Sequence, residues 1–302
     1  MRVFLTGATG WIGSAIVLEL QSAGHQVLGL ARSDENVAAL TSAGVEPHRG
    51  DLEDLDRLAA GAGASDGVIH CGFIHDFSRF AENMAMDRRA VDAMLDALDG
   101  SGKPFVIASG LVGLAQGRPS TEDDPPAAFG RGETEEVVRK AADRGIRSGI
   151  VRLPPTVHGV GDRGFIQWLV DIARSRGVSG YIGDGANRWS AVHRLDAARL
   201  FALALEKGRP GSRYHAIGDI GVAAKDIAAA IGRGLDIPVA SIPAEAAAAH
   251  FDGFMAIVFA LDGSATAEST QAALDWRPEQ PELLADLAGR SYFEGRSKYA
   301  VA

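Results

Sequence analysis

The chain has 302 residues, of which 46% are hydrophobic and 23% are charged, and its formal net charge is −9. A chain of this length forms one elaborated domain or about two domains, and it can bury a large core without disulfide staples. The net negative charge argues against non-specific nucleic-acid binding, because nothing in bulk would neutralise the phosphates.

The single cysteine, Cys71, rules out an intrachain disulfide and fits a reducing compartment. The apolar run at residues 255–261 is far too short to span a bilayer. The first strand is expected to start near Val3, which leaves no room for a signal peptide. We therefore predict a cytoplasmic protein with no membrane partner.

The first motif in the chain is TGATGWIG at residues 6–13. It lies between a short apolar run, which predicts a buried strand, and a segment whose apolar residues repeat at helical spacing. Such a turn favours phosphate, because backbone N–H groups and the helix dipole both attract negative charge. Gly7 can adopt a turn conformation closed to other residues, Gly10 lets the backbone approach a pyrophosphate, and Gly13 allows close helix packing. The alternative is a tight turn without a ligand, since the spacing is G-x-x-G-x-x-G rather than G-x-G-x-x-G.

Strand-like and helix-like segments alternate through the first half of the chain. Short apolar runs predict strands at residues 27–31, 67–70, 105–109 and 150–153, and helical spacing predicts helices at residues 84–98 and 133–142. This alternation predicts an α/β fold with a doubly wound parallel sheet and helices on both faces. Ligands bind such sheets beyond the carboxyl ends of the strands.

The alternation loosens after Pro154. Helices are expected at residues 165–175 and 196–205, with a short strand near Tyr181 and several short helices toward the end. We therefore predict a dinucleotide-binding domain at residues 1–155 and a smaller, mostly helical substrate lobe at residues 156–302. Some segments of the second part are expected to return to the sheet.

The end of the second strand bears on which dinucleotide is bound. An acidic residue there holds a ribose 2′-hydroxyl, whereas a 2′-phosphate needs a cation and hydroxyl donors. The strand ends with Arg32 and Ser33, and the first acid is Asp34. The planar guanidinium of Arg32 suits a phosphate, so NADP(H) is favoured over NAD(H). The alternative is that Arg32 is a solvated surface residue and Asp34 reaches the ribose.

Together these segments resemble the extended short-chain dehydrogenases/reductases, including epimerase/dehydratase-like and dihydroflavonol reductase-like members. TGATGWIG is similar to the TGxxGxxG turn of that family, and RGDL at residues 49–52 is similar to its adenine-contacting segment. Three later segments also resemble family motifs: VRLPPTVHGVGDRG at 151–164, AVHRLDAARL at 191–200 and ALDWRP at 273–278. The resemblance covers nearly the whole chain in order.

The resemblance implies a Rossmann-like sheet of about seven strands, a substrate lobe and a bound nicotinamide dinucleotide. It implies hydride transfer with a tyrosine as acid/base, a lysine four residues later, and an upstream serine or threonine. Asp51 is placed to hold the adenine amino group. The expected cofactor site comprises Gly7, Thr9, Gly10, Trp11, Ile12, Gly13, Arg32, Ser33, Asp51, Leu52, Cys71, Gly72 and Pro154.

The chain departs from the family at the catalytic positions. None of its tyrosines lies between the fifth and sixth strands, and none has a lysine four residues on. The matching positions hold Phe129, which cannot donate a proton, and Glu133, which would raise rather than lower the pKa of a neighbouring phenol. At the end of the fifth strand Ser109 is present, but Gly110 occupies the next position, where the catalytic hydroxyl often lies.

A replacement acid must therefore come from elsewhere. His75 follows the fourth strand, His158 follows the sixth, and His193 precedes Asp196. Histidine titrates in the right range, although a structural role is the alternative for each. The candidate catalytic residues are His75, His158 and Ser109.

Other enzyme classes fit the sequence poorly. Residues 63–67 match G-x-S-x-G, but the strand follows the serine instead of preceding it, which excludes a nucleophile elbow. The polar residues at 70–76 lack the spacing of a metal site, so no metal is expected. Two functions remain open. One is an NADP(H)-dependent oxidoreductase acting on a small carbonyl or alcohol substrate with a non-standard proton donor. The other is a non-catalytic NADP(H)-binding redox sensor or regulator. For both functions, we expect the protein to be a monomer or a homodimer.

Overall fold

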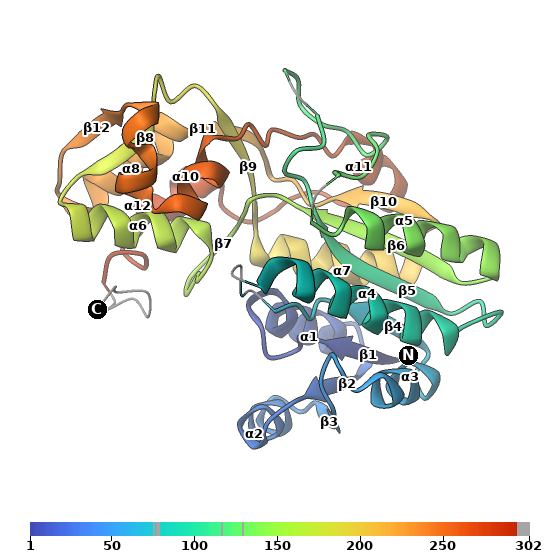
Figure 1. The fold of residues 1–302 in the computed structure, drawn as a ribbon. Coiled ribbons are helices and arrows are strands. Elements are labelled where there is room, and N and C mark those ends of the chain that lie inside the picture. Colours follow the sequence, from blue (N-terminus) through green and yellow to red (C-terminus); the bar gives the residue numbers. More distant parts are fainter. Residues whose placement is uncertain (75, 77–78, 116, 129, 295–302) are drawn as a thin grey trace.

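The computed structural model describes residues 1–74, 76, 79–115, 117–128 and 130–294. The chain forms a sheet domain, at the lower right of Figure 1, and a smaller lobe at its upper left. The N-terminus lies in the sheet domain, and the last described residues lie in the lobe.

A seven-stranded sheet forms the centre of the larger domain, in the order β10-β6-β5-β4-β1-β2-β3. All neighbouring strands are parallel. The order reverses between β1 and β4, which creates the switch point where doubly wound sheets bind ligands. The predicted doubly wound parallel sheet is therefore confirmed. Its strands are β1 (Arg2–Thr6), β2 (Gln26–Ala31), β3 (Glu46–Arg49), β4 (Gly67–His70), β5 (Pro104–Gly110), β6 (Arg147–Leu153) and β10 (Ser212–His215).

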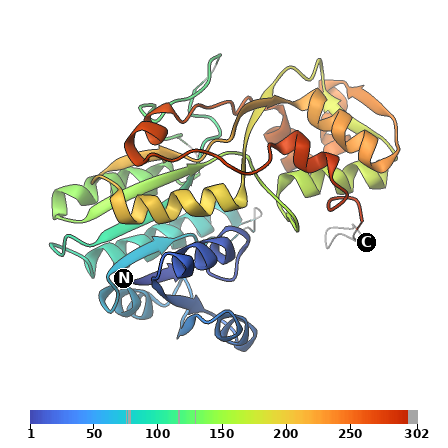
Figure 2. The same ribbon diagram turned by 180° about the vertical axis from the view of Figure 1, so that it is seen from behind.

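Helices cover both faces of this sheet because successive strand residues point to opposite sides. Val3 and Leu5 of β1 pack with helices α1, α2 and α7, whereas Phe4 packs with α3, α4 and α5. Figure 2 shows α7 beside α1 on one face. The helices are α1 (Trp11–Ser22), α2 (Asp34–Ser42), α3 (Leu55–Gly63), α4 (Phe80–Asp96), α5 (Gly132–Lys140) and α7 (Arg194–Lys207), with a 3₁₀ turn at Ala141–Arg144.

The smaller lobe has its own hydrophobic core, built around buried side chains such as Ile166, Trp189 and Phe259. Two small sheets, in the orders β11-β9-β7 and β12-β8, support short helices. The elements are β7 (Thr156–His158), α6 (Phe165–Arg176), β8 (Ser179–Ile182), β9 (Arg188–His193), β11 (Asp219–Ala223), α8 (Ala224–Leu235), β12 (Val239–Ile242), a 3₁₀ turn (Ala244–Ala246), α9 (Ala247–Phe251), α10 (Gly253–Ala260) and α12 (Leu283–Ala288).

The chain crosses between the two parts several times. After β9 it returns to the sheet domain as α7 and β10, and after α10 it returns again as α11 (Glu268–Leu274). Trp276, just beyond α11, is fully buried in the sheet-domain core, and its Nε1 donates to the carbonyl oxygen of Asp196 at 3.1 Å. Segments of the second half therefore complete the first domain.

Candidate functional site

The glycine turn joins β1 to α1 at the carboxyl edge of the sheet. Gly7 has a φ of +72°, and its carbonyl oxygen accepts a hydrogen bond from the Gly10 N–H at 2.9 Å. A Cβ on Gly13 would lie 2.0 Å from that same carbonyl oxygen, so only glycine fits there. Helix α1 has no side-chain cap and no acidic residue in its first turn, which suits an anion at its N-terminus.

A buried polar chain runs behind this turn. Thr6 Oγ1 contacts His70 Nδ1 at 2.7 Å and accepts from the Gly72 N–H at 3.0 Å. His70 Nε2 lies 3.1 Å from Asp87 Oδ1, and Asp87 forms an ion pair with Arg131. Burial opposes ionisation of Asp87, but the Arg131 charge and the His70 contact lower its pKa to about 2. Burial lowers the pKa of His70, which favours the neutral ring.

Arg131 also holds two strand ends together. Its Nη1 donates to the carbonyl oxygen of Ala108 at 2.7 Å, and its Nη2 donates to that of Gly72 at 2.8 Å. Its guanidinium lies 5.0 Å from the ring centroid of Phe73. The sequence did not predict a role for Arg131. In the segment FGRGE at residues 129–133, only the first and last residues were matched to family positions. Of those two, Phe129 lies outside the described residues and Glu133 is exposed.

The hydroxyl at the end of β5 faces a charged cluster. Ser109 Oγ donates to Glu135 Oε2 at 3.0 Å. Glu135 is buried and also accepts from Arg152 Nη2 at 2.5 Å and from Arg213 Nε at 2.8 Å. By contrast, a Cβ on Gly110 would meet nothing within 4 Å. Ser109, which was predicted to be catalytic, is therefore hydrogen-bonded to Glu135 of α5. Gly110, the next residue, has open space beside it but no side chain.

The end of β2 carries the residues predicted to select the dinucleotide. Arg32 is exposed, and none of the described residues forms an ion pair with it. Asp34 forms an ion pair with Arg49. Ser33 caps α2 by accepting from the Asn36 N–H at 3.2 Å, which places it at the same edge.

The glycine turn contacts this edge directly. Asn36 Nδ2 donates to Thr9 Oγ1 at 2.7 Å, which links α2 to the turn. At the end of β3, Asp51 Oδ1 accepts the backbone N–H groups of Glu53 and Asp54 at 2.8 and 3.0 Å, and this orients its carboxylate.

The remaining predicted cofactor residues follow the ends of β3, β4 and β6 or lie at the start of α1. A Cβ on Gly72 would lie 3.0 Å from Thr6 Oγ1 and 3.3 Å from Leu52, so the side chains of Thr6 and Leu52 pack closely against the Gly72 backbone. Burial raises the pKa of the Cys71 thiol to about 12, which leaves it protonated and unreactive. Pro154 is buried after β6, and Ile12 packs against the sheet-domain core.

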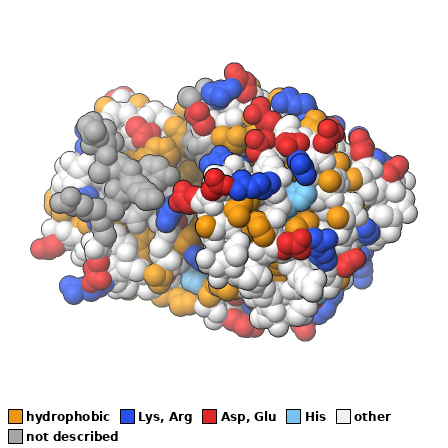
Figure 3. Space-filling model, turned by 90° about the horizontal axis from the view of Figure 1, so that it is seen from below, with side chains coloured by type: hydrophobic (Ala, Val, Ile, Leu, Met, Phe, Trp, Pro, Cys, Tyr) orange, Lys and Arg blue, Asp and Glu red, His pale blue; other side chains and the backbone are white. Residues whose placement is uncertain are grey.

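Trp11 connects the glycine turn to the smaller lobe. Its Nε1 donates to the carbonyl oxygen of Val157 in β7 at 2.8 Å. The guanidinium of Arg194 lies over its ring, 4.2 Å from the centroid. Seen from below, hydrophobic side chains gather where the surface is hollowed between the lobes, while charges of both signs are interspersed on the sheet domain (Figure 3).

His158 is fully buried beside His193. Its Nδ1 lies 2.9 Å from Asp286 Oδ2, and its Nε2 has no hydrogen-bond partner among the described residues. The two histidine rings meet edge to face at 5.4 Å. Nδ1 of His193 accepts from the Leu195 N–H at 3.3 Å, so its proton lies on Nε2. Burial lowers the pKa of His193, which favours this neutral form.

Tyr292 contacts the carboxyl groups of Asp162, which is buried, and of Asp286, which also contacts His158. Its hydroxyl accepts from the Gly159 N–H at 3.2 Å and donates to Asp162 Oδ2 at 3.1 Å. Burial raises the pKa of Asp162 to about 6. Burial also raises the pKa of the Tyr292 phenol, which opposes its use as a proton donor.

His75 lies outside the described residues. The segment around it is anchored to α4, because Asn83 Nδ2 donates to the carbonyl oxygens of Ile74 and Asp76 at 3.2 and 2.8 Å. Ser65 of the G-x-S-x-G match is buried, and its Oγ donates to Gly61 at 2.9 Å. Within the described ranges no group of three or more His, Cys, Asp or Glu residues could hold a metal. No helix in those ranges is long and apolar enough to cross a membrane.

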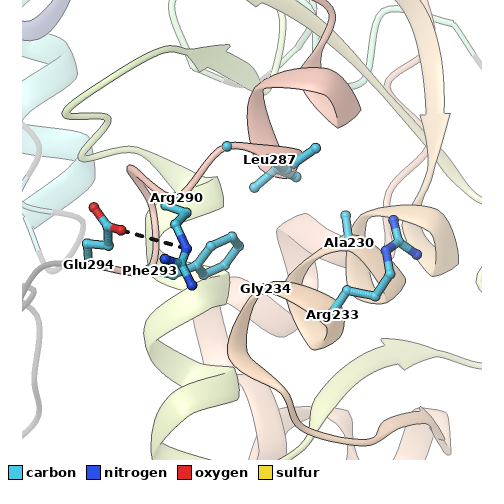
Figure 4. A pocket seen from close by; sticks show the side chains of 9 residues that line it. Ala230, Arg233, Gly234, Leu287, Arg290, Phe293 and Glu294 are labelled. Carbon is cyan, nitrogen blue, oxygen red and sulfur yellow. Dashed lines mark ion pairs between the residues drawn. The ribbon is translucent and has the colours of Figure 1, made fainter.

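A separate surface pocket of about 630 Å³ lies in the smaller lobe (Figure 4). Arg233 and Gly234 of α8 face Phe293, Arg290 and Glu294 across it, and Arg290 pairs with Glu294 at 3.8 Å. None of the residues lining this pocket belongs to the glycine turn or to the strand ends beside it. It is therefore distinct from the candidate site.

Several known proteins are similar to this chain in sequence. A protein of Saccharomyces cerevisiae, "Uncharacterized protein YLL056C", is 48% identical over 95% of this chain and 98% of its own length. "Uncharacterized protein C2A9.02" of Schizosaccharomyces pombe is 46% identical over 97% and 100%. A Stigmatella aurantiaca enzyme, "4-hydroxy-2-methyl-3-oxo-4-farnesyl-3,4-dihydroquinoline-1-oxide ketoreductase", is 27% identical over 71% and 67%.

Solved structures share the fold. DesIV, a dTDP-glucose 4,6-dehydratase from Streptomyces venezuelae with NAD bound, superposes with a TM-score of 0.76 at 22% identity, covering 97% of this chain and 96% of its own. The model of the family described as "NAD dependent epimerase/dehydratase family" matches residues 3–218, well over half of the chain. The chain belongs to the NAD-dependent epimerase/dehydratase family, which also confirms the resemblance seen in its motifs.

Proposed function

We propose that this protein is an NADP(H)-dependent oxidoreductase that acts on a small carbonyl or alcohol substrate with a non-standard proton donor. The observation that carries the cofactor preference is the arrangement at the end of β2. There the first acid after the strand, Asp34, is paired with Arg49, while Arg32 is exposed and forms no ion pair among the described residues. A 2′-phosphate would supply the partner that Arg32 lacks.

The neighbouring polar groups favour the same ligand. Ser33, Asn36 and Thr9 form a hydrogen-bonded group beside Arg32, at the rim where the adenosine ribose lies in such sheets. Hydroxyl and amide groups donate to phosphate oxygens as well as accept from ribose hydroxyls. Arg32 supplies a cation at the end of β2, and the neighbouring hydroxyl and amide groups supply hydrogen-bond donors for a phosphate.

The reaction class rests on family membership and on the substrate lobe. The bacterial relative is named as a ketoreductase, and the present chain carries a complete lobe beside the same turn. A regulatory, non-catalytic role gains no support from the relatives. A small-molecule substrate therefore remains our proposal, with the protein as a monomer or as a homodimer through α4 and α5. We also propose that the protein is cytoplasmic, because its single cysteine fits a reducing compartment.

The proton donor is proposed to be a histidine. Asp286 Oδ2 contacts Nδ1 of His158, so Nε2, which is buried and has no partner among the described residues, is the atom that a bound substrate would have to reach. His75 is the other candidate. We expect His75→Ala or His158→Ala to reduce turnover of NADPH with a responsive ketone by at least about 10²-fold. Full activity in both variants would exclude both, and a wild type inactive against a broad carbonyl panel would favour the redox-sensor function.

The cofactor preference is tested by binding. Isothermal titration should give a lower Kd for NADPH than for NADH in the wild type. Arg32→Ala should weaken NADPH by at least about tenfold, the worth of one charge-assisted contact, and leave NADH nearly unchanged. Arg233→Ala, an exposed arginine on the lobe, is the matched control. Equal affinities of the wild type for both dinucleotides would overturn the preference.

A further inference from the structure

Arg194 is a partly buried cation at the junction of the two lobes. It is the first residue of α7 and follows directly on β9. Its side-chain stem runs along Gly159, where a Cβ would lie 3.2 Å from Arg194 Cγ and 3.3 Å from Cδ. Its guanidinium ends over the Trp11 ring, 4.2 Å from the centroid. The side chain is therefore held in one place at both its stem and its head.

In the part of the chain that the structure describes, this cation has no anionic partner. Among the described residues no carboxylate lies within ion-pair distance of Arg194, and no side chain or carbonyl accepts a hydrogen bond from it. Burial lowers its pKa, and no nearby charge opposes that effect. Three other arginines with little exposure differ from it: Arg131 pairs with Asp87, and Arg152 and Arg213 both pair with Glu135. A partly desolvated guanidinium without a partner is costly unless a ligand supplies the anion.

Trp11 fixes where that anion would lie. It is the first residue of α1, directly after the Gly10 N-cap, and its Nε1 bond to Val157 holds the ring in place. The N-terminus of α1 has neither a side-chain cap nor an acidic residue in its first turn. The Arg194 guanidinium therefore lies over the side chain of Trp11, and the backbone of Trp11 begins the uncapped helix. Both the guanidinium and the helix N-terminus attract anions.

We propose that Arg194 binds the pyrophosphate of the dinucleotide from the lobe side, opposite the backbone N–H groups of the glycine turn. This inference rests on the proposed function, since it requires a bound dinucleotide. Arg194 begins the helix that packs against α1, and it follows the strand that leads out of the lobe. Arg194 is therefore a cofactor-binding residue at the point where the chain passes from the lobe into the sheet domain.

The test compares Arg194→Met with the wild type by titration calorimetry. Methionine keeps an unbranched side chain over Trp11 but removes the charge and the donors. The NADPH Kd should rise by at least about tenfold, the worth of a charge-assisted contact. The Kd for 2′-AMP, which has no pyrophosphate, should stay unchanged. Arg194→Lys should recover part of the affinity, because it restores the charge without the planar fork.

Arg209→Met is the matched control, since Arg209 is an exposed arginine just beyond the opposite end of α7. Circular dichroism and a melting curve establish that each variant is folded. A folded Arg194→Met protein that binds NADPH as tightly as the wild type overturns the inference, as does an equal loss for NADPH and 2′-AMP. A wild type that binds neither NADPH nor NADH overturns the proposed function itself, which separates the two failures.

Discussion

Arg131 holds together several groups at the carboxyl edge of the sheet. It pairs with the buried Asp87 and also binds the carbonyl oxygens of Gly72 and Ala108. Arg131→Met would leave Asp87 charged and unpaired, so we expect a loss of about 3–5 kcal/mol in the free energy of unfolding, measured with urea. Adding Asp87→Asn should recover part of that loss, because the unpaired charge disappears.

The neighbouring ion pair on α4 provides the control for this prediction. Arg88 and Asp92 form a solvent-exposed pair at 3.0 Å, one helical turn apart. Arg88→Met should cost less than about 1 kcal/mol, since exposed pairs contribute little. A similar cost for the Arg131 and Arg88 variants would contradict the structural role assigned to Arg131.

Asp162 makes the stability of the lobe depend on pH. Its folded pKa of about 6 lies above the ordinary value of 3.8, so the folded state binds this proton more tightly. The resulting stabilisation is complete below about pH 4 and is lost as the pH rises through about 6. Asp162→Asn cannot lose a proton, so its stability relative to the wild type should increase by up to about 3 kcal/mol between pH 4 and pH 8. Denaturant unfolding at several pH values measures this difference, and a difference that stays constant with pH would refute the prediction.

The residues of the site were only partly predictable from the sequence. Gly7, Gly10 and Gly13 lie within seven residues of one another, and their spacing between a strand pattern and a helix pattern predicted the turn that the structure contains. Arg131 and Glu135 were not predicted, because their partners come from distant parts of the chain and no local pattern marks them. Local chemistry can be read from spacing, whereas buried ion pairs depend on which strand ends the fold brings together.

At the scale of elements, the junction of β1 and α1 depends on the missing side chain of Gly13. Gly13→Ala would place a methyl group 2.0 Å from the Gly7 carbonyl oxygen, which forces the helix away from the turn. We expect a loss of about 1–3 kcal/mol in stability and a weaker affinity for NADPH, measured by unfolding and titration. Gly63→Ala, on α3, meets nothing within 4 Å and should change neither property appreciably. Unaltered NADPH binding by the Gly13 variant would mean that the turn does not hold the dinucleotide.

Within the seven-stranded sheet, the sequence predicted central strands better than edge strands. Central strands such as β1, β4 and β5 were predicted within one or two residues, because burial on both faces makes them apolar. The two edges of the sheet are β3 and β10: a strand at β3 was implied only by the numbering of the later strands, without bounds, and no strand was predicted at β10. Their sequences, EPHR and SRYH, are polar because an edge strand is partly solvated. Hydrophobic pattern therefore finds the centre of a parallel sheet more readily than its borders.

At the scale of the whole molecule, the sheet domain needs the second half of the chain. Helix α7 packs beside α1 on one face of the seven-stranded sheet, and its residues Leu200, Phe201 and Leu205 are fully buried there. A fragment of residues 1–155 would lack α7 and the edge strand β10. We expect this fragment to be insoluble or without a cooperative thermal transition, as followed by circular dichroism. A soluble, cooperatively melting fragment would show that the first domain is independent.

The repeated crossing of the chain also limits how the protein can be altered. The lobe is entered separately at β7, at β11 and at α12, with parts of the sheet domain between these entries. A lobe from a relative could not be grafted as one cassette, because every splice would have to match a return to α7, β10 or α11. Changes of substrate preference within such a fold are therefore expected to accumulate as point substitutions and loop changes, rather than by exchange of a whole module.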